Sequence, residues 1–506
     1  MSEKKSLFRR SLDSVEVIGN ALPHPATIFG ILAVVVVIVS GITATMDLSA
    51  IHPGTKEIIT VRNLLSAEGI RWMFENVEAN FVSFPPLGLV LVAMIGIGVA
   101  EGSGLITVVI RALVLKAPPR LITMAVVAAG VLSHLASEAG YVVLIPLGAV
   151  MFYALGRHPI AGLAAAFAGV SGGFGANFLI GSVDPVLAGL TQSAAQIIDP
   201  EILISPATNI YFMFVSAAMV VIIGSLVTEK IVEPRLGKYQ GEEKPIEMER
   251  LTVVERKGIL LAGISVLVVL ALFAITVIPE KGLLRIPGET VLHSAFFNGM
   301  ITAIMIFFLI PGVVYGIVTG SIRSDKDGIK QMITSMSHLA TYIVLVFFAA
   351  QFVFYFNYSR LGLILAIEGA ELLSHIGFTG IPLMIAFIIV SAFINMFMGS
   401  ASAKWAIMAP VFVPMFMLLG YHPSLTQMVF RVGDSITNVI TPMMSYFALI
   451  VAFAEKYDED YGIGTIISTM LPYSIVFGIV WTLLLVAWML FELPVGPDGP
   501  LRYLPG

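Results

Sequence analysis

The chain has 506 residues, of which 58% are hydrophobic and 12% are charged, and its formal net charge is -5. This composition excludes an ordinary soluble protein and a disordered chain, and it indicates a polytopic membrane protein in a lipid bilayer. The small net charge, without basic runs interleaved with aromatic residues, argues against nucleic acid as a partner. The absence of cysteine excludes disulfides, thiolate metal sites and cysteine nucleophiles.

The chain begins with the polar and basic stretch MSEKKSLFRRSLDSVEVIGNALPHP. It has no apolar core followed by a small-residue cleavage site, so a cleaved signal peptide is not expected. Residues 1–22 are predicted to be a cytoplasmic N-terminal arm.

Apolar runs along the rest of the chain predict nine membrane crossings, because a helix needs roughly twenty apolar residues to span a bilayer. Two further apolar stretches are too long for one helix and too interrupted for two full ones. Residues 121–156 and 382–419 are therefore predicted to be re-entrant hairpins, each with a polar tip and two short arms. The nine crossings are expected at 25–46, 85–116, 160–190, 207–229, 258–279, 295–319, 337–358, 424–454 and 466–490.

The loops support this count, because cytoplasmic loops of membrane proteins collect Lys and Arg. Basic residues concentrate in the N-terminal arm, in the loop 230–257 and just after residue 320, and nine crossings place all three on one side. The segment 47–80 and the tail 491–506 then lie on the periplasmic side. The chain is accordingly divided into a first half, 23–229, the cytoplasmic loop, scaffold helices at 258–319, and a second half, 320–490.

An internal repeat relates the two halves. The pattern P-x9-G-x-H-P occurs twice with a constant offset of 264 residues, at Pro146, Gly156, His158 and Pro159, and again at Pro410, Gly420, His422 and Pro423. Chance is the alternative explanation, since Pro and Gly are common at helix ends. A duplication agrees better with the matching order of elements, and the odd number of intervening crossings inverts the second copy. Inverted repeats with interrupted helices are typical of secondary transporters, whose sites lie between the repeats.

Each copy is followed by a crossing that is expected to be broken in its middle, at 169–178 and 433–442. Irregular backbone at membrane depth survives only where protein or a water-filled cavity satisfies its polar groups. Asn177 and Asn438 lie at the two breaks, while Ser402 lies at the tip of the second hairpin and Asn395 just before it. We expect these side chains to face a common cavity suited to a cation or a polar solute.

Charged residues inside the predicted crossings are costly and indicate function. Asp184 lies in the first broken helix without a basic residue within a helical turn, so it needs a partner across the fold, a cation or a proton. Arg431 and Asp434 are three residues apart in the second broken helix, where they could simply neutralise each other. These patterns do not separate proton coupling from cation coordination.

Motifs of enzymes and of ATP-driven pumps are absent from the sequence. It contains no H-E-x-x-H, no P-loop, and no S-x-x-K at Lys404 because residue 401 is Ala. The chain is not expected to be an enzyme. A passive channel remains an alternative from another class, although broken inverted repeats favour alternating access.

Several long stretches resemble blocks of the AbgT family of bacterial inner-membrane transporters. They occur in family order along nearly the whole chain and include VIGNALPHP, RNLLSAEGIRWMFENV, GRHPIAGLAAAFAGVSGGFGANFLI, EPRLG, APVFVPMFMLLGYHP and RVGDSITNVITPMMSYF. The resemblance implies an all-α polytopic membrane protein that forms a bowl-shaped homodimer, with nine transmembrane helices and two hairpins per subunit. It also implies an inner transport core and an outer dimerising scaffold.

The resemblance implies a function as well. Some family members are described as importers of p-aminobenzoyl-glutamate, and others as exporters of sulfonamide antimetabolites that use the proton gradient. We therefore expect a gradient-driven transporter of p-aminobenzoate-like compounds with sulfonamide export as a measurable activity. The alternative is a sodium-coupled carboxylate importer of similar architecture.

The positions that resemble functional ones in the family are Asp184, Asn395, Ser402, Trp405, Pro423, Arg431 and Asp434. In this interpretation the two aspartates handle the coupling cation or proton, the indole of Trp405 stacks on an aromatic substrate, and Arg431 holds an acidic group or positions Asp434. No cofactor is expected apart from a sodium ion that could bind near Asp184, Asn177 and Asn395. Lys404 departs from the family pattern and has no role in this interpretation.

Overall fold

The structure is a computed structural model that describes residues 23–51, 56–115, 117–136, 140–239, 251–288, 291, 294–444, 446–458 and 461–504. The predicted N-terminal arm, 1–22, and residues 240–250 of the predicted cytoplasmic loop lie outside the described residues. Within the described part the fold is helical, apart from isolated bridges and one short antiparallel pair in which Ala50 lies opposite Ile59. The two strands are β1 (Ser49–Ile51) and β2 (Ile58–Thr60).

Eight helical stretches in the described part are long and apolar enough to cross a membrane. Seven of them coincide with predicted crossings, and the eighth, α19 (Ala401–Leu418), is an arm of the second predicted hairpin. The other two predicted crossings are interrupted, which is why neither reaches the required length. The seven stretches contain α2 (Pro25–Thr45), α4 (Pro85–Gly102), α10 (Ile210–Val227) with η5 (Thr228–Val232) and α11 (Glu233–Leu236), α12 (Val253–Val277), α14 (Met300–Thr319), α16 (Ala340–Tyr358) and α22 (Ile463–Leu490). The stretch that contains α4 begins at Ala67, and α5 (Leu105–Leu115), which forms the rest of the predicted crossing 85–116, is a separate shorter helix.

Both interrupted crossings are broken, although each break begins later than predicted because residues 169–172 and 433–438 are still helical. The first runs through α8 (Pro159–Phe167) and the π-helical turn η4 (Ala168–Gly172), leaves the helical path, and resumes as α9 (Val183–Ala195). The second is α20 (Pro423–Asn438) followed by α21 (Phe447–Glu455). In each case the chain between the two helical parts is irregular at mid-crossing, as expected for a transporter core.

Both hairpins are present as pairs of short helices. The first consists of η1 (Pro119–Leu121), α6 (Ile122–Leu132), η2 (Ser133–Ala136), η3 (Gly140–Leu144) and α7 (Ile145–Ala154). The second consists of α18 (Gly380–Asn395) and α19. The remaining helices connect these parts: α3 (Ala67–Val82), α13 (Ala295–Asn298), α15 (Asp325–His338) and α17 (Leu361–His375).

The repeated G-x-H-P turns have the same local structure. Gly156 and Gly420 both have positive φ, +71° and +84°, a conformation that glycine adopts without strain. The amide of Arg157 donates to the carbonyl of Phe152 at 2.8 Å, and in the second copy Tyr421 donates to Phe416 at 2.9 Å.

The following helices are also capped in the same way. His158 Nδ1 accepts from the amide of Ile160, and His422 Nδ1 accepts from the amide of Ser424, each at 3.3 Å. In both copies a proline follows the histidine as the first helical residue, where its missing amide hydrogen has no cost. The repeat is therefore a shared turn rather than a chance match.

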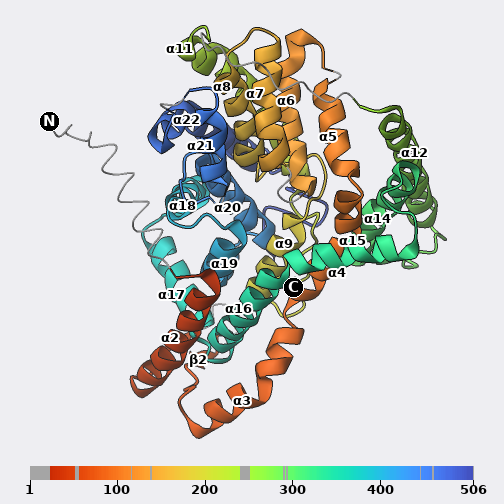
Figure 1. Cartoon of the computed structure of the whole chain (residues 1–506). Helices are drawn as coiled ribbons and strands as arrows, with labels where there is room; N and C mark the ends of the chain where they lie inside the picture. Colours follow the sequence, from red (N-terminus) through yellow and green to blue (C-terminus); the bar gives the residue numbers. More distant parts are fainter. Residues whose placement is uncertain are drawn as a thin grey trace, which may run out of the picture.

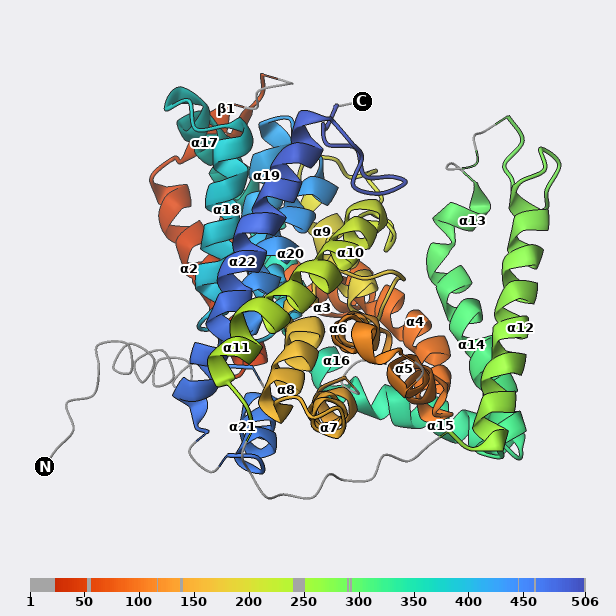
Figure 2. The ribbon, with the colours of Figure 1, turned by 90° about the horizontal axis from the view of Figure 1, so that it is seen from above.

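The two turns lie at opposite ends of the same crossing. Asn209, which precedes α10, donates to the carbonyl of Ser424 at 2.8 Å, beside the second turn. Arg157 of the first turn donates to Glu233 in α11 at 2.9 Å. Ile210–Leu236 is a helical span of 27 residues, about 40 Å long, so the two copies enter the membrane from opposite sides. Figure 2 shows the same arrangement, with α7 and α8 at the lower edge and α17, α18 and α19 toward the upper edge.

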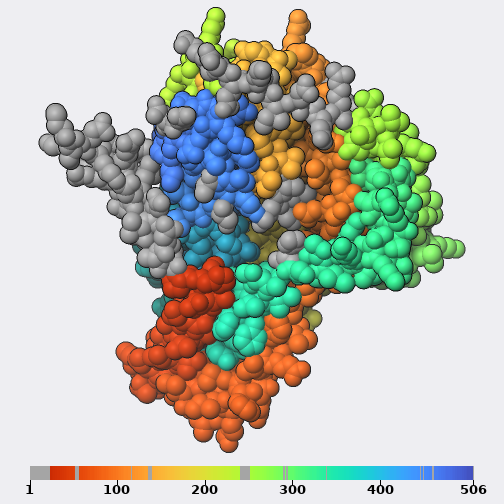
Figure 3. Space-filling model, in the orientation of Figure 1, coloured from red at the N-terminus to blue at the C-terminus, as the bar shows by residue number. Residues whose placement is uncertain are grey.

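Peripheral helices surround this core. α12 and α14 form a pair at one side of the molecule, joined to the body through α15, and α2 packs on α16 at another side (Figures 1 and 2). In Figure 3, α2 and α3 form a red and orange lobe that projects from the body. The hairpins and broken helices lie between these peripheral parts, so the irregular backbone is enclosed by protein.

Candidate transport site

Helix α20 lies at the centre of the core and is polar although it is buried. Fifteen of its sixteen residues are buried, including Gln427, Arg431, Asp434, Ser435 and Asn438. Burial of charged and polar groups is unfavourable unless they are paired and hydrogen-bonded. The partners of this helix therefore define a site.

The first partner of α20 is Asp184. The Arg431 guanidinium forms an ion pair with Asp184 Oδ1, and Asp184 Oδ2 accepts from the amide of Gly181 at 2.6 Å. Asp184 lies in the first turn of α9, where the helix dipole favours a carboxylate. Asp184 thus finds its basic partner across the fold, and the ion pair joins the two halves. The alternative that Arg431 neutralises Asp434 on its own helix is wrong.

The second partner of α20 is the tip of the second hairpin. The Lys404 ammonium pairs with Asp434 Oδ1 and also donates to Asn395 Oδ1, and the Lys404 side chain is fully buried. The Asn395 amide nitrogen donates to the Asp434 carbonyl at 2.8 Å and contacts Thr437 Oγ1 at 2.9 Å and Asn438 Oδ1 at 2.8 Å. Lys404, which had no role in the sequence interpretation, is therefore the counter-charge of Asp434.

Trp405, whose indole is expected to stack on an aromatic substrate, is fully buried next to Lys404 in this conformation. Its indole nitrogen donates to Thr191 Oγ1 at 2.8 Å, and its ring stacks on Phe430 with a centroid separation of 4.5 Å. Thr191 in turn donates to Gln427 at 2.5 Å. The indole is thus held between α9 and α20, and an aromatic solute would have to displace Phe430 to stack on it.

Two other predicted residues have local roles. Ser402 is partly buried, and its hydroxyl lies 3.3 Å from that of Ser400 at the start of α19. Pro423 is buried as the first residue of α20. Their contribution to substrate binding stays a prediction.

At the first break, close packing accounts for a glycine. Gly175 does not have positive φ. A Cβ there would lie 2.5 Å from Ser435 Oγ and 2.7 Å from the Arg431 carbonyl, so the break touches α20 directly. Ser435 Oγ accepts from the Gly175 amide at 2.7 Å and donates to the Arg431 carbonyl at 2.7 Å. Asn177 is buried at the same break, and its side-chain oxygen accepts from the amide of Phe178 at 2.9 Å.

Sequence reasoning missed Ser435, Thr191 and Gln427. Gln427 and Ser435 lie in the predicted crossing 424–454, where the dense polarity of 423–438 was the available signal, whereas Thr191 lies one residue beyond the predicted crossing 160–190.

The three residues expected near a sodium ion are not gathered into one ligand set. Asp184 is paired with Arg431, Asn395 Oδ1 accepts from Lys404, and Asn177 Oδ1 accepts from a backbone amide. Each of these oxygens already has a donor in this conformation. The described residues also contain no group of three or more His, Cys, Asp or Glu side chains that could hold a metal.

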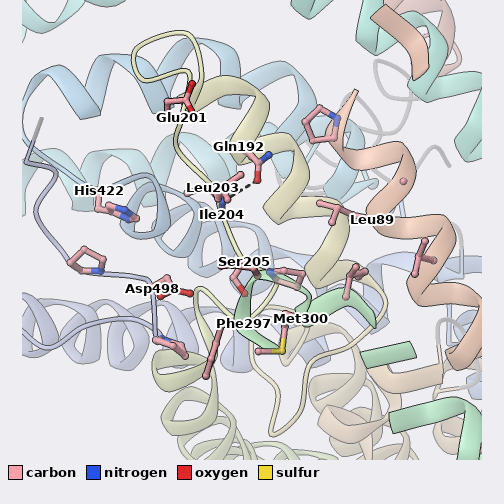
Figure 4. Close-up of a pocket in the computed structure, with 18 of the residues that line it drawn as sticks. Leu89, Gln192, Glu201, Leu203, Ile204, Ser205, Phe297, Met300, His422 and Asp498 are labelled. Carbon is pink, nitrogen blue, oxygen red and sulfur yellow. Dashed lines mark hydrogen bonds between the residues drawn. The ribbon is translucent and has the colours of Figure 1, made fainter. Parts of the chain in front are cut away.

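A cavity of about 1120 Å³ opens on the side of the C-terminal tail. Figure 4 shows His422 and Gln192 among its lining residues, with the loop that carries Glu201, Ile204 and Ser205. Gln192 Oε1 accepts from the amide of Ile204 at 3.0 Å and so fixes this loop on α9. Burial lowers the pKa of His422 to about 4, so its ring is neutral at pH 7. The cavity thus reaches the ends of both helices that carry the Asp184–Arg431 pair.

Comparison with known proteins identifies the family. The profile of the AbgT transporter family matches residues 10–503. The chain belongs to the AbgT family. It is 40% identical over 484 residues to the p-aminobenzoyl-glutamate transport protein of Escherichia coli strain K12, covering 96% of this chain and 95% of that protein.

Two solved structures are similar to this AbgT-family chain. The YdaH transporter of Alcanivorax borkumensis is 43% identical with a TM-score of 0.89, covering 94% of this chain and all 100% of that one. MtrF of Neisseria gonorrhoeae, described as illuminating a class of antimetabolite efflux pumps, is 47% identical with a TM-score of 0.91, covering 97% and 100%. The predicted family and the all-α membrane fold are confirmed. The chain is a multi-pass membrane transporter of a small-molecule substrate, in line with the prediction that it is not an enzyme.

Proposed function

We propose that this protein is a secondary active transporter of p-aminobenzoyl-glutamate and p-aminobenzoate-like compounds, able to export sulfonamide antimetabolites and driven by the proton or sodium gradient. Its similarity to the Escherichia coli protein and to MtrF supports the substrate class. The observation that carries the proposal is the pair of buried ion pairs on α20, one to α9 and one to the second hairpin. The Asp184–Arg431 pair joins the two repeats, which move against each other when a transporter of this build alternates its access, and the Lys404–Asp434 pair joins the second hairpin to α20 within one repeat.

Arg431 is the group best placed to bind an acidic substrate. Its guanidinium pairs with Asp184, while its Nε has no hydrogen-bond partner among the described residues and is buried. A buried donor without an acceptor is unfavourable, and guanidinium groups bind carboxylates through two parallel hydrogen bonds. A substrate carboxylate would accept a hydrogen bond from the unpaired Nε and compete with Asp184 for Nη2.

The competition provides a way to couple transport to a gradient. Protonation of Asp184 removes its negative charge and weakens its hold on Arg431, so the guanidinium becomes available to the substrate. Asp434 would respond in the same way toward Lys404. Trp405 would stack on the aminobenzoyl ring after Phe430 moves, because the two rings are now in contact.

Transport in proteoliposomes tests the proposal. Labelled p-aminobenzoyl-glutamate and a labelled sulfonamide are each offered with an imposed proton gradient, an imposed sodium gradient, or neither. We expect accumulation that requires a gradient. Sodium-dependent uptake of a broad range of carboxylates would favour the carboxylate importer. Flux that continues unchanged without any gradient would favour a passive channel.

The setting in the membrane is part of the same proposal. In Figure 2, α11 and α15 lie in the lower half of the view. The first carries Arg235 and the second Lys326 and Lys330, and basic residues on one side of the molecule support a cytoplasmic N-terminus in a bacterial inner membrane. Only 17% of the crossing window of α12 is buried, so its apolar surface is available for lipid or for the second subunit of a homodimer. Cysteine cross-linking across α12 in native membranes tests the homodimer, and a dimer band absent at every α12 position would contradict it.

A further inference from the structure

Lys404 is a charged residue in an unfavourable place. It lies in the first turn of α19, where the positive end of the helix dipole repels a cation, and its side chain is fully buried at membrane depth. Desolvation of an ammonium costs several kcal/mol, as an order of magnitude, unless other groups compensate it. Its charge rather than its packing therefore explains a lysine at this position.

The groups around the ammonium are those that a small hard cation takes. Its two oxygen partners are the Asp434 carboxylate and the Asn395 side-chain carbonyl. Asn438 donates to the second Asp434 oxygen at 3.2 Å, and Asn395 is itself held by the Asp434 carbonyl and Thr437. Carboxylate and amide oxygens are the usual ligands of hard metal cations, so the oxygens are arranged as a cation site whose cation is supplied by the chain.

The site also joins two irregular parts of the backbone. A Cβ at Gly399, in the hairpin tip, would collide with the carbonyl of Met443, in the second break. Thr441 donates to the carbonyl of Met396 at 3.3 Å. The tip and the break thus meet beside the Lys404–Asp434 pair, where a cation holds the two together.

The first half of the chain lacks these groups. At the same 264-residue offset, Lys404 corresponds to Gly140, Asn395 to Val131 and Asp434 to Val170. A Cβ at Gly140 would collide with the hydroxyl of Ser133, so a lysine does not fit there. The cation belongs to one repeat only.

We infer that the Lys404 ammonium is a tethered cation that occupies the place of a free sodium ion between the second hairpin and the break of α20. This inference deepens the proposed function and rests on it only for the transport readout. Sodium therefore does not bind at Asp434 in the natural protein. It binds there when the lysine is replaced by a neutral residue that leaves the oxygens in place.

Thermal unfolding of the purified full-length protein tests sodium binding without any substrate. NaCl is titrated against choline chloride at constant ionic strength, for the natural protein, Lys404→Gln and Lys404→Arg. We expect Tm of the natural protein and of the Arg variant to be indifferent to sodium, and Tm of the Gln variant to rise by about 2 °C or more as sodium saturates the site. Lys330→Gln, which removes an exposed lysine of α15, is the matched control and is expected to show no sodium-specific shift.

Two outcomes would overturn the inference. One is a sodium-specific rise in Tm of the natural protein that Asp434→Asn abolishes. The other is a Lys404→Gln variant that folds but gains no sodium response. If the Lys404→Gln variant does not fold, the sodium titration of the natural protein and of Asp434→Asn still decides the question. The double variant Lys404→Met with Asp434→Asn removes both charges, so it leaves no buried charge unpaired and is expected to show no sodium response.

A transport measurement separates this inference from the proposed function. In proteoliposomes, Lys404→Gln is expected to require sodium, with at least about a tenfold loss of rate when choline replaces it, whereas the natural protein is indifferent. Absence of gradient-driven transport in the natural protein would contradict the proposed function and leave the Tm result standing. A Lys404→Gln variant that transports without regard to sodium would contradict the inference alone.

Discussion

Helices α8 and α20 begin with the same turn and the same histidine cap and are both followed by a break, but they differ in their side chains. α8 is built from apolar residues and glycine, whereas α20 carries Arg431, Asp434 and a row of buried polar side chains. At the 264-residue offset, Arg431 corresponds to Phe167 and Asp434 to Val170. The repeat therefore preserves a backbone path, while the charged chemistry is concentrated on one copy and the other contributes a single carboxylate from beyond its break.

The largest effect is expected when the charge that joins the two copies is left unpaired. Arg431→Gln leaves Asp184 buried without its counter-ion, and loss of one partner of a buried ion pair costs about 3–5 kcal/mol. Adding Asp184→Asn should recover most of the stability but none of the transport. Thermal unfolding and proteoliposome uptake measure the two effects separately.

The assignment of the coupling groups rests on two single variants. Asp184→Asn and Asp434→Asn are each expected to abolish gradient-driven accumulation, because neither amide can release a proton or carry the charge that pairs with Arg431 or Lys404. Normal accumulation by both variants would show that these aspartates do not couple transport.

A smaller loss is expected where the first break touches α20. Gly175→Ala places a methyl group against Ser435 and the Arg431 backbone, and overpacking of this kind costs about 1–3 kcal/mol. Gly263→Ala on α12 is the matched control, because a Cβ there meets nothing within 4 Å. Unfolding midpoints that fall equally for both variants would argue against a close contact at the break.

The shared turn predicts equal losses in the two copies. Gly156→Ala and Gly420→Ala both force a side chain into a left-handed conformation with open space around it, at a cost of about 1–2 kcal/mol each. Denaturation of the two variants should give the same difference within error. A loss of stability confined to one copy would mean that the two turns have the same shape but contribute differently to the stability of the fold.

The last prediction concerns the histidine cap of α20 and pH. Burial lowers the pKa of His422 from 6.5 to about 4, so the neutral cap stabilises the folded state fully above pH 6.5 and this contribution is lost as the pH falls toward 4. His422→Asn keeps a capping side chain without a titrating ring, and its stability should change less between those values. Tm measured from pH 7 to pH 4 for both proteins checks the sign.

Much of the architecture could be read from the sequence. The crossings, the two hairpins and the two breaks follow from run lengths, prolines and glycines, because the bilayer forces every backbone polar group into a helix or into an enclosed irregular segment. The inverted orientation of the second repeat was predicted from the repeated turn and from the odd number of crossings between its two copies. Asp184, Arg431 and Asp434 were recognisable because charges at membrane depth are rare and expensive.

The pairing of those charges was decided only by the tertiary structure. Arg431 and Asp434 are three residues apart and could have neutralised each other. Instead Arg431 pairs with Asp184, more than two hundred positions away in the sequence, and Asp434 pairs with Lys404 at the tip of the second hairpin. Sequence spacing describes neighbours on one helix, whereas a buried charge chooses the partner that packing brings within reach. For the same reason Lys404 looked like an exception in the sequence and became, in the fold, the cation that Asp434 requires.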